Sequence, residues 1–575
     1  MRALTKFLRD VWSLTWPYWF SEERWSARAL LVLVVALNLG LVYISVLFNE
    51  WYNLFYNALQ DRAEDAYYHQ LLRFLLLAAI HIAMAIYAFY LNRMLQIRWR
   101  RWLTHRYLDQ WLADRVYYRM QLTDPGTDNP DQRIADDLRY FVFWTMLFTL
   151  DFMRQVVTLV SFMAILWGLS RDISSFVVLG VDIAVPGFMM WAALLYAIVG
   201  TWLTHQVGRP LAKLNFEQQR READFRYSLV RFRENADGIA LYGGEADENR
   251  GLRQRFADLF AVLWAVMQRQ KLVIALTNVY GQLAVIFPFV VAAPRYFTDS
   301  AAQIGILLQT ANAFGRVQDA LSWFVDNYRD LAEWKATVDR LAGFQAALAR
   351  ARGVTGGAKV RPSEGGDLTL DDVRVALPSG RTLIEEARET VEPGQSVLVT
   401  GASGVGKSTL FRTLAGIWPY GEGAIHFPKD ARVLFLPQKP YLPIGTLREV
   451  ICYPAKPAGT DDAALTEVMD ACGLDQFRAR LDEAQNWSLQ LSPGEQQRIA
   501  FARALVIKPD WLFLDEATSS LDHATEDRLY RLLRERLPAT TLVSIGHRAT
   551  LTQYHDRRLE VRPEEDGSGR LVAVP

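Results

Sequence analysis

The sequence predicts a two-part fold, in which a membrane-embedded bundle of six transmembrane α-helices precedes a C-terminal α/β domain. Nearly all long apolar runs of the 575 residues lie before residue 330, and so do most of the 18 tryptophans. Such runs cross a bilayer as helices, and tryptophan is enriched at membrane surfaces. After residue 367, short apolar runs alternate with helical stretches, which is typical of a mostly parallel sheet covered by helices.

Composition excludes several classes of protein. The 63 basic and 63 acidic residues cancel, so nucleic acid is not expected as a partner. A hydrophobic content of 51% and a mean hydropathy of +0.02 argue against a purely soluble, disordered or collagen-like chain. The two cysteines, Cys452 and Cys472, both lie in the polar half, which excludes a disulfide framework.

Residues 1–28 mix aromatic and charged side chains after a basic start. They contain no continuous apolar region and no small-residue cleavage site, so a signal peptide is not predicted. We expect a helix that lies in the membrane interface on the cytoplasmic side.

The membrane domain is predicted over residues 29–345, with long charged helical extensions into the cytoplasm at 96–140 and 205–270. Runs of about 20 apolar residues are long enough to span a bilayer as helices. Arg316 and Asp319 interrupt the last run, and Pro288 lies within the fifth. The predicted spans are residues 30–48, 74–91, 141–169, 176–203, 272–293 and 304–325.

Basic residues in the loops predict the orientation. With a cytoplasmic N-terminus, the outer loops carry little more than Arg62, Arg171 and Arg295. This asymmetry satisfies the positive-inside rule and places the C-terminal domain in the cytoplasm, at the bacterial inner membrane. The cytoplasmic side then receives Arg2, Lys6, Arg9, Arg98, Arg100, Arg101, Arg106, Arg209, Lys213, Arg220 and Arg221.

Ionisable residues at membrane depth are candidates for a substrate path. Asp151 and Arg154 share one helical face, so they either pair with each other or serve transport. His81 is either a packing residue or a proton relay, and for Asp182 a hydrated structural role and a functional role remain open. Two further expectations are that Arg316 and Asp319 face a central cavity and that Glu50 and Trp51 belong to an outer gate.

The C-terminal half begins with a linker and contains a predicted phosphate-binding loop. Residues 346–366, rich in Gly with Pro and Ser, are the predicted linker to the domain at 367–575. The apolar run 396–400 predicts a buried strand, and the sequence GASGVGKST and a helical stretch follow it, which is the GxxxxGK[ST] pattern in the context it requires. Lys407 would neutralise the β- and γ-phosphates of a nucleotide, and the hydroxyl of Ser408 would bind Mg²⁺. The loop that would bind the nucleotide comprises Gly401, Ala402, Ser403, Gly404, Val405, Gly406, Lys407, Ser408 and Thr409, with backbone N–H groups pointing at phosphate oxygens.

Two carboxylates end a second apolar strand, WLFLDE at residues 511–516. Paired acids at the end of a buried strand indicate a bound cation or a reacting water. We expect Asp515 to hold Mg²⁺, and Glu516 to orient and deprotonate the attacking water.

The sequence LSPGEQQR at 491–498 resembles the signature motif of ABC ATPases. In the expected order, Gln438 resembles the Q-loop glutamine, Asp522 in SSLD the D-loop aspartate, and His547 the switch histidine. The resemblance implies that Gln438 and His547 join Glu516 in catalysis and that Gln438 also contacts Mg²⁺. It further implies that Ser492, Gly494, Glu495 and Asp522 contact ATP bound by a second copy of the chain, in a homodimer.

Two residues depart from the family pattern. Leu377 stands where many ABC proteins stack an aromatic ring on adenine, and losing such a contact costs about 1–3 kcal/mol if nothing replaces it. Pro493 stands where glycine is usual in the signature, which removes one backbone donor.

The whole chain is similar to an ABC half-transporter of exporter architecture. The motifs at 49–53 and 55–58 resemble the SbmA/BacA-type membrane domain. Those at 417–421, 445–448 and 453–454 resemble the branch that includes peroxisomal fatty-acyl transporters and bacterial relatives of SbmA/BacA, and the motif at 233–244 is similar to both groups. The resemblance implies an ATP-hydrolysing transporter of bulky, mainly hydrophilic cargo, such as cobalamin-like compounds or peptides, working inward. Two alternatives remain, a transporter of lipids or fatty-acyl-CoA and a proton-coupled carrier with a regulatory ATPase.

Overall fold

A computed structural model describes residues 2–123, 129–170, 176–178, 181–183, 186–298, 303–354, 356–455, 461–565 and 567–574. By their contacts these residues form two compact units, and each is described by itself below. The first unit contains residues up to 109 and from 129 to 345, and the second contains residues 110–123 and those from 346 onward.

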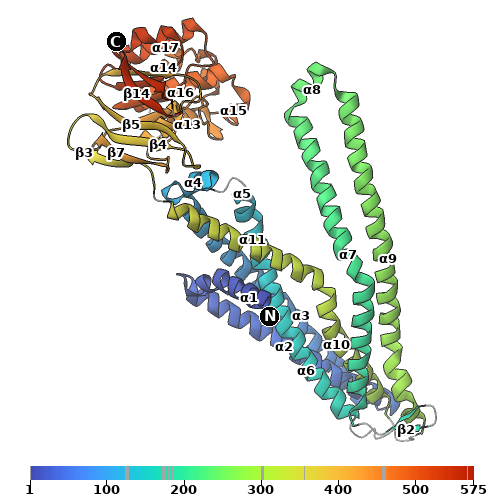
Figure 1. The fold of residues 1–575 in the computed structure, drawn as a ribbon. Coiled ribbons are helices and arrows are strands. Elements are labelled where there is room, and N and C mark those ends of the chain that lie inside the picture. The colour runs from blue at the N-terminus through green and yellow to red at the C-terminus, as the bar shows by residue number, and fades with distance from the viewer. Residues whose placement is uncertain are drawn as a thin grey trace. The chain divides into compact units, whose positions relative to one another are not determined.

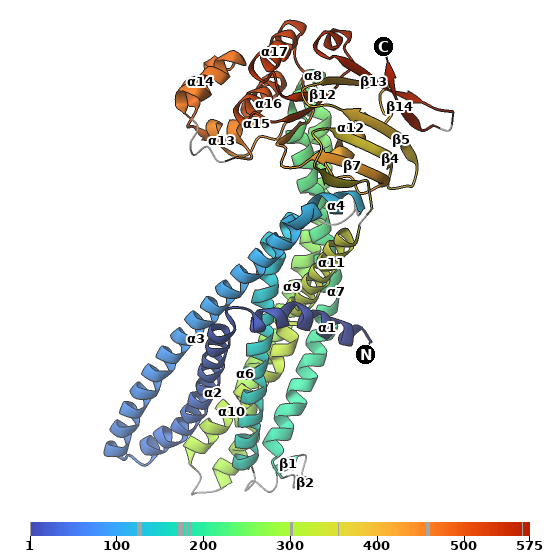
Figure 2. The ribbon, with the colours of Figure 1, turned by 90° about the vertical axis from the view of Figure 1, so that its left-hand side faces the viewer.

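The first unit is built from helices that follow one another along the chain (Figures 1 and 2). Five helical segments, at residues 24–60, 64–123, 130–170, 188–234 and 245–291, are long and apolar enough to cross a membrane. The elements are α1 (Arg2–Thr15), η1 (Trp16–Phe20), α2 (Arg24–Gln60), α3 (Glu64–Leu112), α5 (Pro130–Gln132), η3 (Arg133–Asp137), α6 (Leu138–Ser170), α7 (Phe188–Glu234), α8 (Ala236–Tyr242), α9 (Glu245–Thr298), α10 (Ile304–Asp326) and α11 (Tyr328–Gly353).

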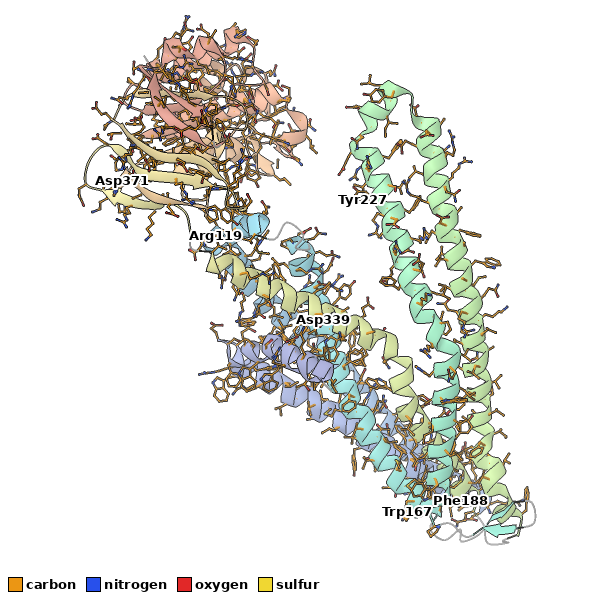
Figure 3. The ribbon with its side chains drawn as sticks, in the orientation of Figure 1. Arg119, Trp167, Phe188, Tyr227, Asp339 and Asp371 are labelled. Carbon is orange, nitrogen blue, oxygen red and sulfur yellow. The ribbon has the colours of Figure 1, made fainter. Side chains whose placement is uncertain are left out.

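The fourth predicted span begins later than the sequence suggested. β1 (Phe176–Val178) and β2 (Val181–Ile183) pair as an antiparallel hairpin, and α7 begins only at Phe188. Asp182 therefore lies in β2 and outside the span. A short Val- and Ile-rich run fits a strand as well as a helix, which is why periodicity alone misassigned it. Figure 3 shows Phe188 at the start of α7 close to Trp167 near the end of α6.

The other predicted spans lie within helices. The first, second, third and fifth fall inside α2, α3, α6 and α9, each in a segment that is apolar enough to cross a membrane. The sixth is helical as α10, although α10 is not among those five segments in the described part of the chain. A total of six spans therefore stays a prediction.

α7 and α9 form a long helical hairpin with α8 at its tip (Figures 1 and 2). The polar stretches predicted as extensions, residues 205–234 and 245–270, make up its far arm. At the tip, Leu241 is 86% exposed and Tyr242 is 92% exposed. Two large apolar side chains without cover mark this tip as a surface for further contacts.

The N-terminal segment has two apolar faces. One face is buried, where Phe7 packs edge-on against Trp334 at 5.0 Å and Tyr18 stacks on Trp99 at 5.6 Å. The other face is exposed and carries an aromatic or aliphatic side chain at every fourth position, namely Leu4, Leu8, Trp12, Trp16 and Phe20. A second, uncovered apolar stripe suits a helix at a membrane interface, as predicted from the sequence.

Two groups of ion pairs in the helical unit concern α6 and the residues just before it. Arg154 and Asp151 lie 3.2 Å apart, so they form an ion pair. This was one of the two alternatives that the sequence left open. Asp137, 3% exposed, accepts two hydrogen bonds from Arg340 at 2.7 and 3.0 Å and also pairs with Arg133. This cluster fastens α11 to the base of α6, and a buried carboxylate that lost these partners would be strongly destabilising.

A ladder of carboxamide side chains joins α2 to α10. Asn49 donates to the carbonyl oxygen of Gln309 at 2.9 Å, and Asn53 donates to the side-chain oxygen of Gln309 at 2.9 Å. Asn57 accepts from the backbone N–H of Gly305 at 2.8 Å. A Cβ on Gly305 would lie 2.2 Å from the carbonyl oxygen of Asn53, so the close approach of the helices requires glycine here. The three asparagines are four residues apart and share one face of α2.

Residues expected at an outer gate contact α3. Glu50 pairs with Arg73 at 2.8 Å, and the indole N–H of Trp51 donates to the carbonyl oxygen of Gln70 at 2.8 Å. His81 lies edge-on to Phe48 at 6.0 Å, in an aromatic environment between α2 and α3. Their roles in gating or proton transfer stay predictions.

The second unit contains a mixed ten-stranded sheet in the order β3-β7-β4-β5-β14-β13-β6-β12-β11-β8. Its strands are β3 (Lys359–Ser363), β4 (Leu368–Ala376), β5 (Thr382–Val391), β6 (Ser396–Gly401), β7 (Gly421–Pro428), β8 (Val433–Leu436), β11 (Trp511–Asp515), β12 (Thr541–Ile545), β13 (Arg557–Pro563) and β14 (Gly569–Val574). The remaining elements are η2 (Ala113–Arg115), α4 (Val116–Thr123), α12 (Lys407–Leu414), β9 (Gly445–Thr446), α13 (Leu447–Cys452), α14 (Asp462–Ala471), η4 (Asp475–Arg480), β10 (Ala484–Gln485), α15 (Trp487–Gln490), α16 (Pro493–Ile507), α17 (His523–Arg536) and η5 (Ala549–Tyr554).

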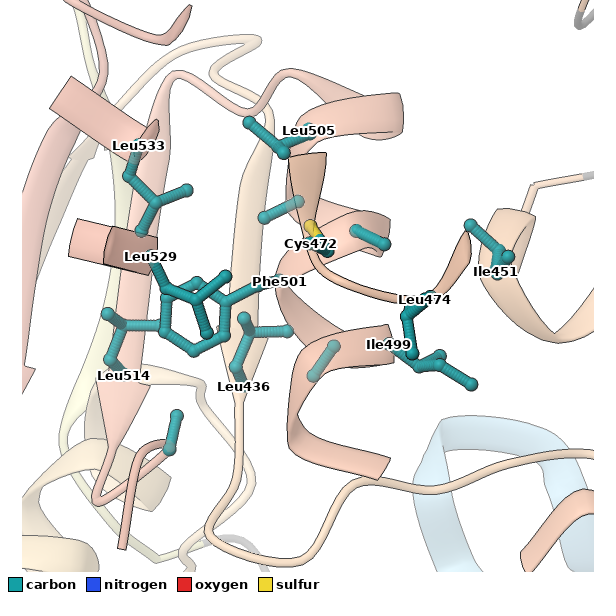
Figure 4. Packing of buried hydrophobic residues seen from close by; sticks show 14 of the residues in the cluster. Leu436, Ile451, Cys472, Leu474, Ile499, Phe501, Leu505, Leu514, Leu529 and Leu533 are labelled. Carbon is teal, nitrogen blue, oxygen red and sulfur yellow. The ribbon is translucent and has the colours of Figure 1, made fainter. Parts of the chain in front are cut away.

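Four neighbouring strands of this sheet, β6, β12, β11 and β8, run parallel. β6, β12 and β11 are almost completely buried, which explains their continuous apolar sequences. β8 lies at the edge of the sheet, and only its last residue, Leu436, is buried. Figure 4 shows the core on one face, where Leu436 of β8 and Leu514 of β11 meet Phe501 of α16 and Leu529 of α17. Because the strands are parallel and in register, the loops that leave their carboxyl ends meet at one edge of the sheet.

Residues 110–123 group with the second unit, although the sequence places them inside the predicted membrane domain. Arg115 donates to the carbonyl oxygen of Ala415 at 2.9 Å, and Leu122 packs against the apolar core that includes Phe411 and Leu414. α4 is therefore attached to the end of α12, the helix that follows the phosphate-binding loop.

A buried histidine makes the stability of the second unit sensitive to pH. Nδ1 of His555 donates to the carbonyl oxygen of Leu551 at 2.7 Å, and Nε2 accepts from the hydroxyl of Ser544 at 2.8 Å. Burial lowers the pKa of His555 from 6.5 to about 4. Between these values the unfolded chain binds more protons than the folded one, so stability rises with pH across this window and is lost as pH falls.

We expect the full-length protein to lose on the order of 3 kcal/mol of stability through His555 as pH falls from about 6.5 to 4. Thermal unfolding in detergent at several pH values measures this loss. The His555→Gln variant cannot titrate there and should show a smaller slope of stability against pH. Equal slopes in the two proteins would show that His555 is not the responsible group.

Candidate nucleotide-binding site

The loop between β6 and α12 has the predicted order of strand, glycine-rich loop and helix. Gly401, Gly404 and Gly406 have φ angles of +142°, +80° and +106°, which favour glycine. A Cβ on Gly401 would lie 2.7 Å from the carbonyl oxygen of Val561 on the neighbouring strand. The loop therefore curls tightly and brings its backbone N–H groups to the start of α12, where a helix favours bound anions.

Lys407, the first residue of α12, is 5% exposed. Its ammonium donates to the carbonyl oxygens of Gly401 at 2.9 Å and Ala402 at 2.8 Å. Burial lowers the pKa of Lys407, while the nearby carboxylates of Glu516 and Asp515 act in the opposite direction. A buried cation inside a glycine-rich loop at the start of a helix suits the phosphates of a nucleotide.

Ser408 and Asp515 bring two oxygen ligands together. The hydroxyl of Ser408 donates to a carboxylate oxygen of Asp515 at 2.9 Å. Burial raises the pKa of Asp515, and the hydrogen bond from Ser408 partly offsets this effect. A hydroxyl and a carboxylate are hard donors that fit Mg²⁺, which takes only one or two protein ligands beside phosphates and water. Gln438, the third predicted ligand, contacts Glu516 instead of this pair.

The three residues predicted to be catalytic meet at one carboxylate. Oε1 of Glu516 lies 2.9 Å from Nε2 of His547, and the amide of Gln438 donates to Oε2 at 3.3 Å. Glu516 has a φ of +50°, which is unusual for a residue with a side chain, and its N–H donates to the carbonyl oxygen of Ile545 at 3.1 Å. Such strain is characteristic of functional positions.

Strand order explains why these residues meet. The phosphate-binding loop follows β6, His547 follows β12, Asp515 and Glu516 end β11, and Gln438 follows β8. These four strands are consecutive neighbours in the sheet. Residues about 145 positions apart in the chain therefore lie at one edge, where ligands bind in sheets of this kind.

The signature segment lies at the start of α16, where Ser492 is the N-cap. The hydroxyl of Ser492 accepts from the N–H of Glu495 at 3.3 Å, and Glu495 accepts from the N–H of Ser492 at 2.8 Å. Pro493 occupies the first helical position, where the missing N–H has no partner within the helix in any case. Its departure from the family pattern is thus compatible with a regular helix start.

The remaining predicted ATP contacts do not join the loop at 401–409. Asp522 caps α17 by accepting from the N–H of Thr525 at 2.8 Å. Within the described ranges, no hydrogen bond or ion pair connects Ser492, Gly494, Glu495 or Asp522 to residues 401–409. One chain therefore brings together the phosphate loop, the two acids, Gln438 and His547, and leaves the signature apart.

Gln497 is a residue that the sequence reasoning missed. It is 2% exposed, and its amide donates to the carbonyl oxygen of Gln438 at 3.0 Å and to Ser519 at 3.1 Å. Its side-chain oxygen accepts from the N–H of Ser520 at 2.9 Å. Gln497 thus ties the signature helix to the segments around Gln438 and Asp522. Its position one helical turn before buried Phe501 is a signal, because a polar residue on an apolar face needs buried partners.

A second missed connection lies behind His547. Glu526, 2% exposed, accepts from Thr518 at 2.6 Å and from Arg548 at 3.2 Å. Arg548 also donates to the carbonyl oxygen of Leu521 at 3.0 Å. The residue after the histidine is therefore fastened to the segment that leads from Glu516 to Asp522.

Leu377 belongs to a turn, since its N–H donates to the carbonyl oxygen of Arg381 at 2.8 Å. Its side chain packs at the border of the apolar core, as does Val405 of the phosphate loop. The contact of Leu377 with an adenine ring stays a prediction.

Comparison with known protein families matches both halves of the chain. Residues 15–297 match the family described as ABC transporter transmembrane region 2, and residues 384–519 match the family described as ABC transporter. The chain is 35% identical to the inner membrane ABC transporter ATP-binding protein YddA of Escherichia coli over 533 residues, which covers 92% of this chain and 93% of that protein. It is 27% identical to the lysosomal cobalamin transporter ABCD4 of Mus musculus over 617 residues, covering 100% of this chain and 97% of that protein.

A solved structure shows the same fold. A bacterial Atm1-family ABC exporter with ATP bound superposes with a TM-score of 0.69 at 18% identity, over 94% of each chain. At this identity the likeness concerns the fold alone. It confirms the predicted exporter-like arrangement of a helical membrane domain followed by an ATPase domain.

Proposed function

The chain belongs to the ABC transporters, which couple ATP hydrolysis to transport, and we propose that it carries bulky hydrophilic compounds inward across the bacterial inner membrane. The observation that carries this proposal is the likeness to a cobalamin transporter, which extends over 100% of this chain. Cobalamin-like molecules and peptides are the proposed cargo. The motifs at 49–53 and 55–58 support a place in the SbmA/BacA-like branch.

The site geometry supports a defined role for each residue. The backbone of residues 401–406 and the ammonium of Lys407 would bind the β- and γ-phosphates of ATP. Ser408 and Asp515 would hold Mg²⁺, which supplies positive charge against the phosphate oxygens when it is bound. Glu516 would accept the proton of the attacking water, and His547 and Gln438 keep its carboxylate in place.

A second copy of the chain would complete the site. Ser492 and Gly494 make no contact with the phosphate loop of their own chain in the described residues, which supports a homodimer in which each signature faces the partner's ATP. The movement that closes this dimer would be transmitted to the membrane helices by contacts between exposed apolar side chains. Leu241 and Tyr242 provide such side chains on α8, and Tyr441 and Ile444, after Gln438, provide others.

Reconstitution into liposomes tests the proposed cargo. We expect cobalamin or a hydrophilic peptide to stimulate ATP hydrolysis, whereas a long-chain acyl-CoA should not. The release of phosphate is measured with each compound at matched concentrations. Stimulation by acyl-CoA alone would contradict the proposed cargo class. Absence of ATP hydrolysis, or a monomer both in detergent and in the bilayer, would contradict the proposed mechanism.

A further inference from the structure

A polar pocket lies among α7, α9 and α10 of the first unit. Its volume is about 370 Å³. This is near the lower end of the range of about 300–1,000 Å³ for small-molecule sites, so the pocket fits one polar group of a larger compound. The lining residues are Gly200, Thr201, Thr204, Thr277, Tyr280, Gly281, Gln318, Asp319 and Ser322.

The predicted spans place the pocket toward the end of the membrane domain that lies opposite the starts of α7 and α10. Thr204 of α7 and Asp319 of α10 follow the starts of their helices, Phe188 and Ile304, by roughly 20–25 Å at the helical rise of about 1.5 Å per residue. The hydrocarbon core is about 30 Å thick, so with α7 and α10 taken as the predicted spans these residues lie in its far half, counted from those helix starts. Polar groups at such depth are costly and characteristically mark a substrate path.

An aromatic cluster adjoins the pocket through Tyr280, which is one of the lining residues. Tyr196 stacks on Tyr280 with ring centres 4.5 Å apart, Tyr196 lies 5.2 Å from Phe287, and Phe287 lies 5.3 Å from Phe314. A Cβ on Gly200 would lie 2.1 Å from the ring of Tyr280, so glycine makes room for this ring. Tyr280 therefore belongs both to this aromatic cluster and to the lining of the pocket.

The charge in the lining comes from Asp319. In the described part of the chain, its carboxylate makes no hydrogen bond and no ion pair within 4.0 Å. Arg316, one turn earlier on α10, acts on it only at longer range and does not line the pocket. The hydroxyls of Thr201, Thr204 and Ser322 add hydrogen-bond acceptors around the carboxylate.

We propose that this pocket binds a protonated amine or a guanidinium group of the transported compound. Asp319 supplies the opposite charge, and the ring of Tyr280 offers the aromatic face that attracts cations. The hydroxyls accept the N–H groups of the ligand. An anionic group would meet the carboxylate of Asp319 without a lining cation to balance it. This inference rests on the proposed transport function and adds the chemical class of the group that is recognised.

Labelling of a cysteine in the pocket tests the proposal without any need for transport. The natural Cys452 and Cys472 are buried, so a Thr204→Cys variant of the full-length protein in lipid nanodiscs offers a distinct thiol to a maleimide. The probes are the end-blocked tripeptides Lys-Gly-Lys, Gln-Gly-Gln and Glu-Gly-Glu. We expect Lys-Gly-Lys to slow the labelling at concentrations at least about tenfold lower than the other two.

Three further variants, each combined with Thr204→Cys, identify the responsible charge. Asp319→Asn should abolish the preference for Lys-Gly-Lys, and Asp319→Glu should keep it. Arg316→Gln is the matched control on the same helix and should also keep it. Equal protection by all three peptides, or protection by Glu-Gly-Glu that is lost in Arg316→Gln, would overturn the proposal.

The same nanodiscs separate this inference from the proposed function. ATP hydrolysis is measured beside the labelling in each preparation of the Thr204→Cys protein. Hydrolysis without a charge preference in the pocket would contradict the inference alone. A charge preference without hydrolysis would contradict the proposed function and leave the pocket assignment standing.

Discussion

Replacing Glu516 by glutamine should slow ATP hydrolysis at least about 100-fold, which is the contribution that a general base typically makes. The amide has the shape of the carboxylate but cannot accept a proton from water. His547 and Gln438 hold Glu516 at 2.9 and 3.3 Å, so the loss is one of chemistry and not of position. ATP binding should persist, because the phosphate loop does not depend on this side chain.

The measurement compares the rate of phosphate release with the affinity for a fluorescent ATP analogue in the same preparation. Glu535→Gln is a matched control, since Glu535 is an exposed residue on the surface of α17. It should leave both quantities unchanged. Unchanged hydrolysis in Glu516→Gln would remove this residue from the mechanism.

Replacing Lys407 by alanine should weaken ATP binding by roughly 10- to 100-fold, as expected for the loss of charged hydrogen bonds worth about 1.5–3 kcal/mol. The buried ammonium faces the backbone carbonyls of Gly401 and Ala402, at the centre of the phosphate loop. Uptake into vesicles should fall with ATP binding. Equilibrium titration with the ATP analogue and uptake of labelled cargo measure the two effects.

This variant also separates an ATP-driven transporter from a proton-coupled carrier. Lys359→Ala, at an exposed position on β3, is the control and should retain both binding and uptake. If uptake persisted in Lys407→Ala but collapsed on addition of an uncoupler, the ATPase would only regulate a proton-driven carrier.

The sequence predicted which side chains lie together at the site better than it predicted the residues that support them. The apolar strand, the glycine spacing and Lys407 depend on local geometry, and local geometry follows from neighbouring residues. The meeting of Glu516 with His547 and Gln438 follows once the strands are taken as parallel neighbours. Gln497 escaped notice because its partners are backbone groups and serines of segments distant in the chain, which no local pattern reveals.

The sequence predicted the secondary structure well where long apolar runs determine it, and less well where the runs are short. Helices such as α2 and α9 follow directly from long uncharged runs. The run at 176–183 is too short for periodicity to separate strand from helix, and tertiary pairing decided in favour of the hairpin. Residues 110–123 continue the helical pattern of α3, and only their contacts with Ala415 and the core around Phe411 associate them with the α/β unit.

The ladder between α2 and α10 consists entirely of uncharged amides, and this fixes how the two helices can part. Each rung exchanges one amide partner for a water molecule, at a net cost of only about 0.5–1.5 kcal/mol. The hydrogen bonds of Asn49, Asn53 and Asn57 can therefore break one after another along α2. These hydrogen bonds should keep the same strength at different pH values and membrane potentials, because carboxamide groups neither titrate in the physiological range nor carry a net charge.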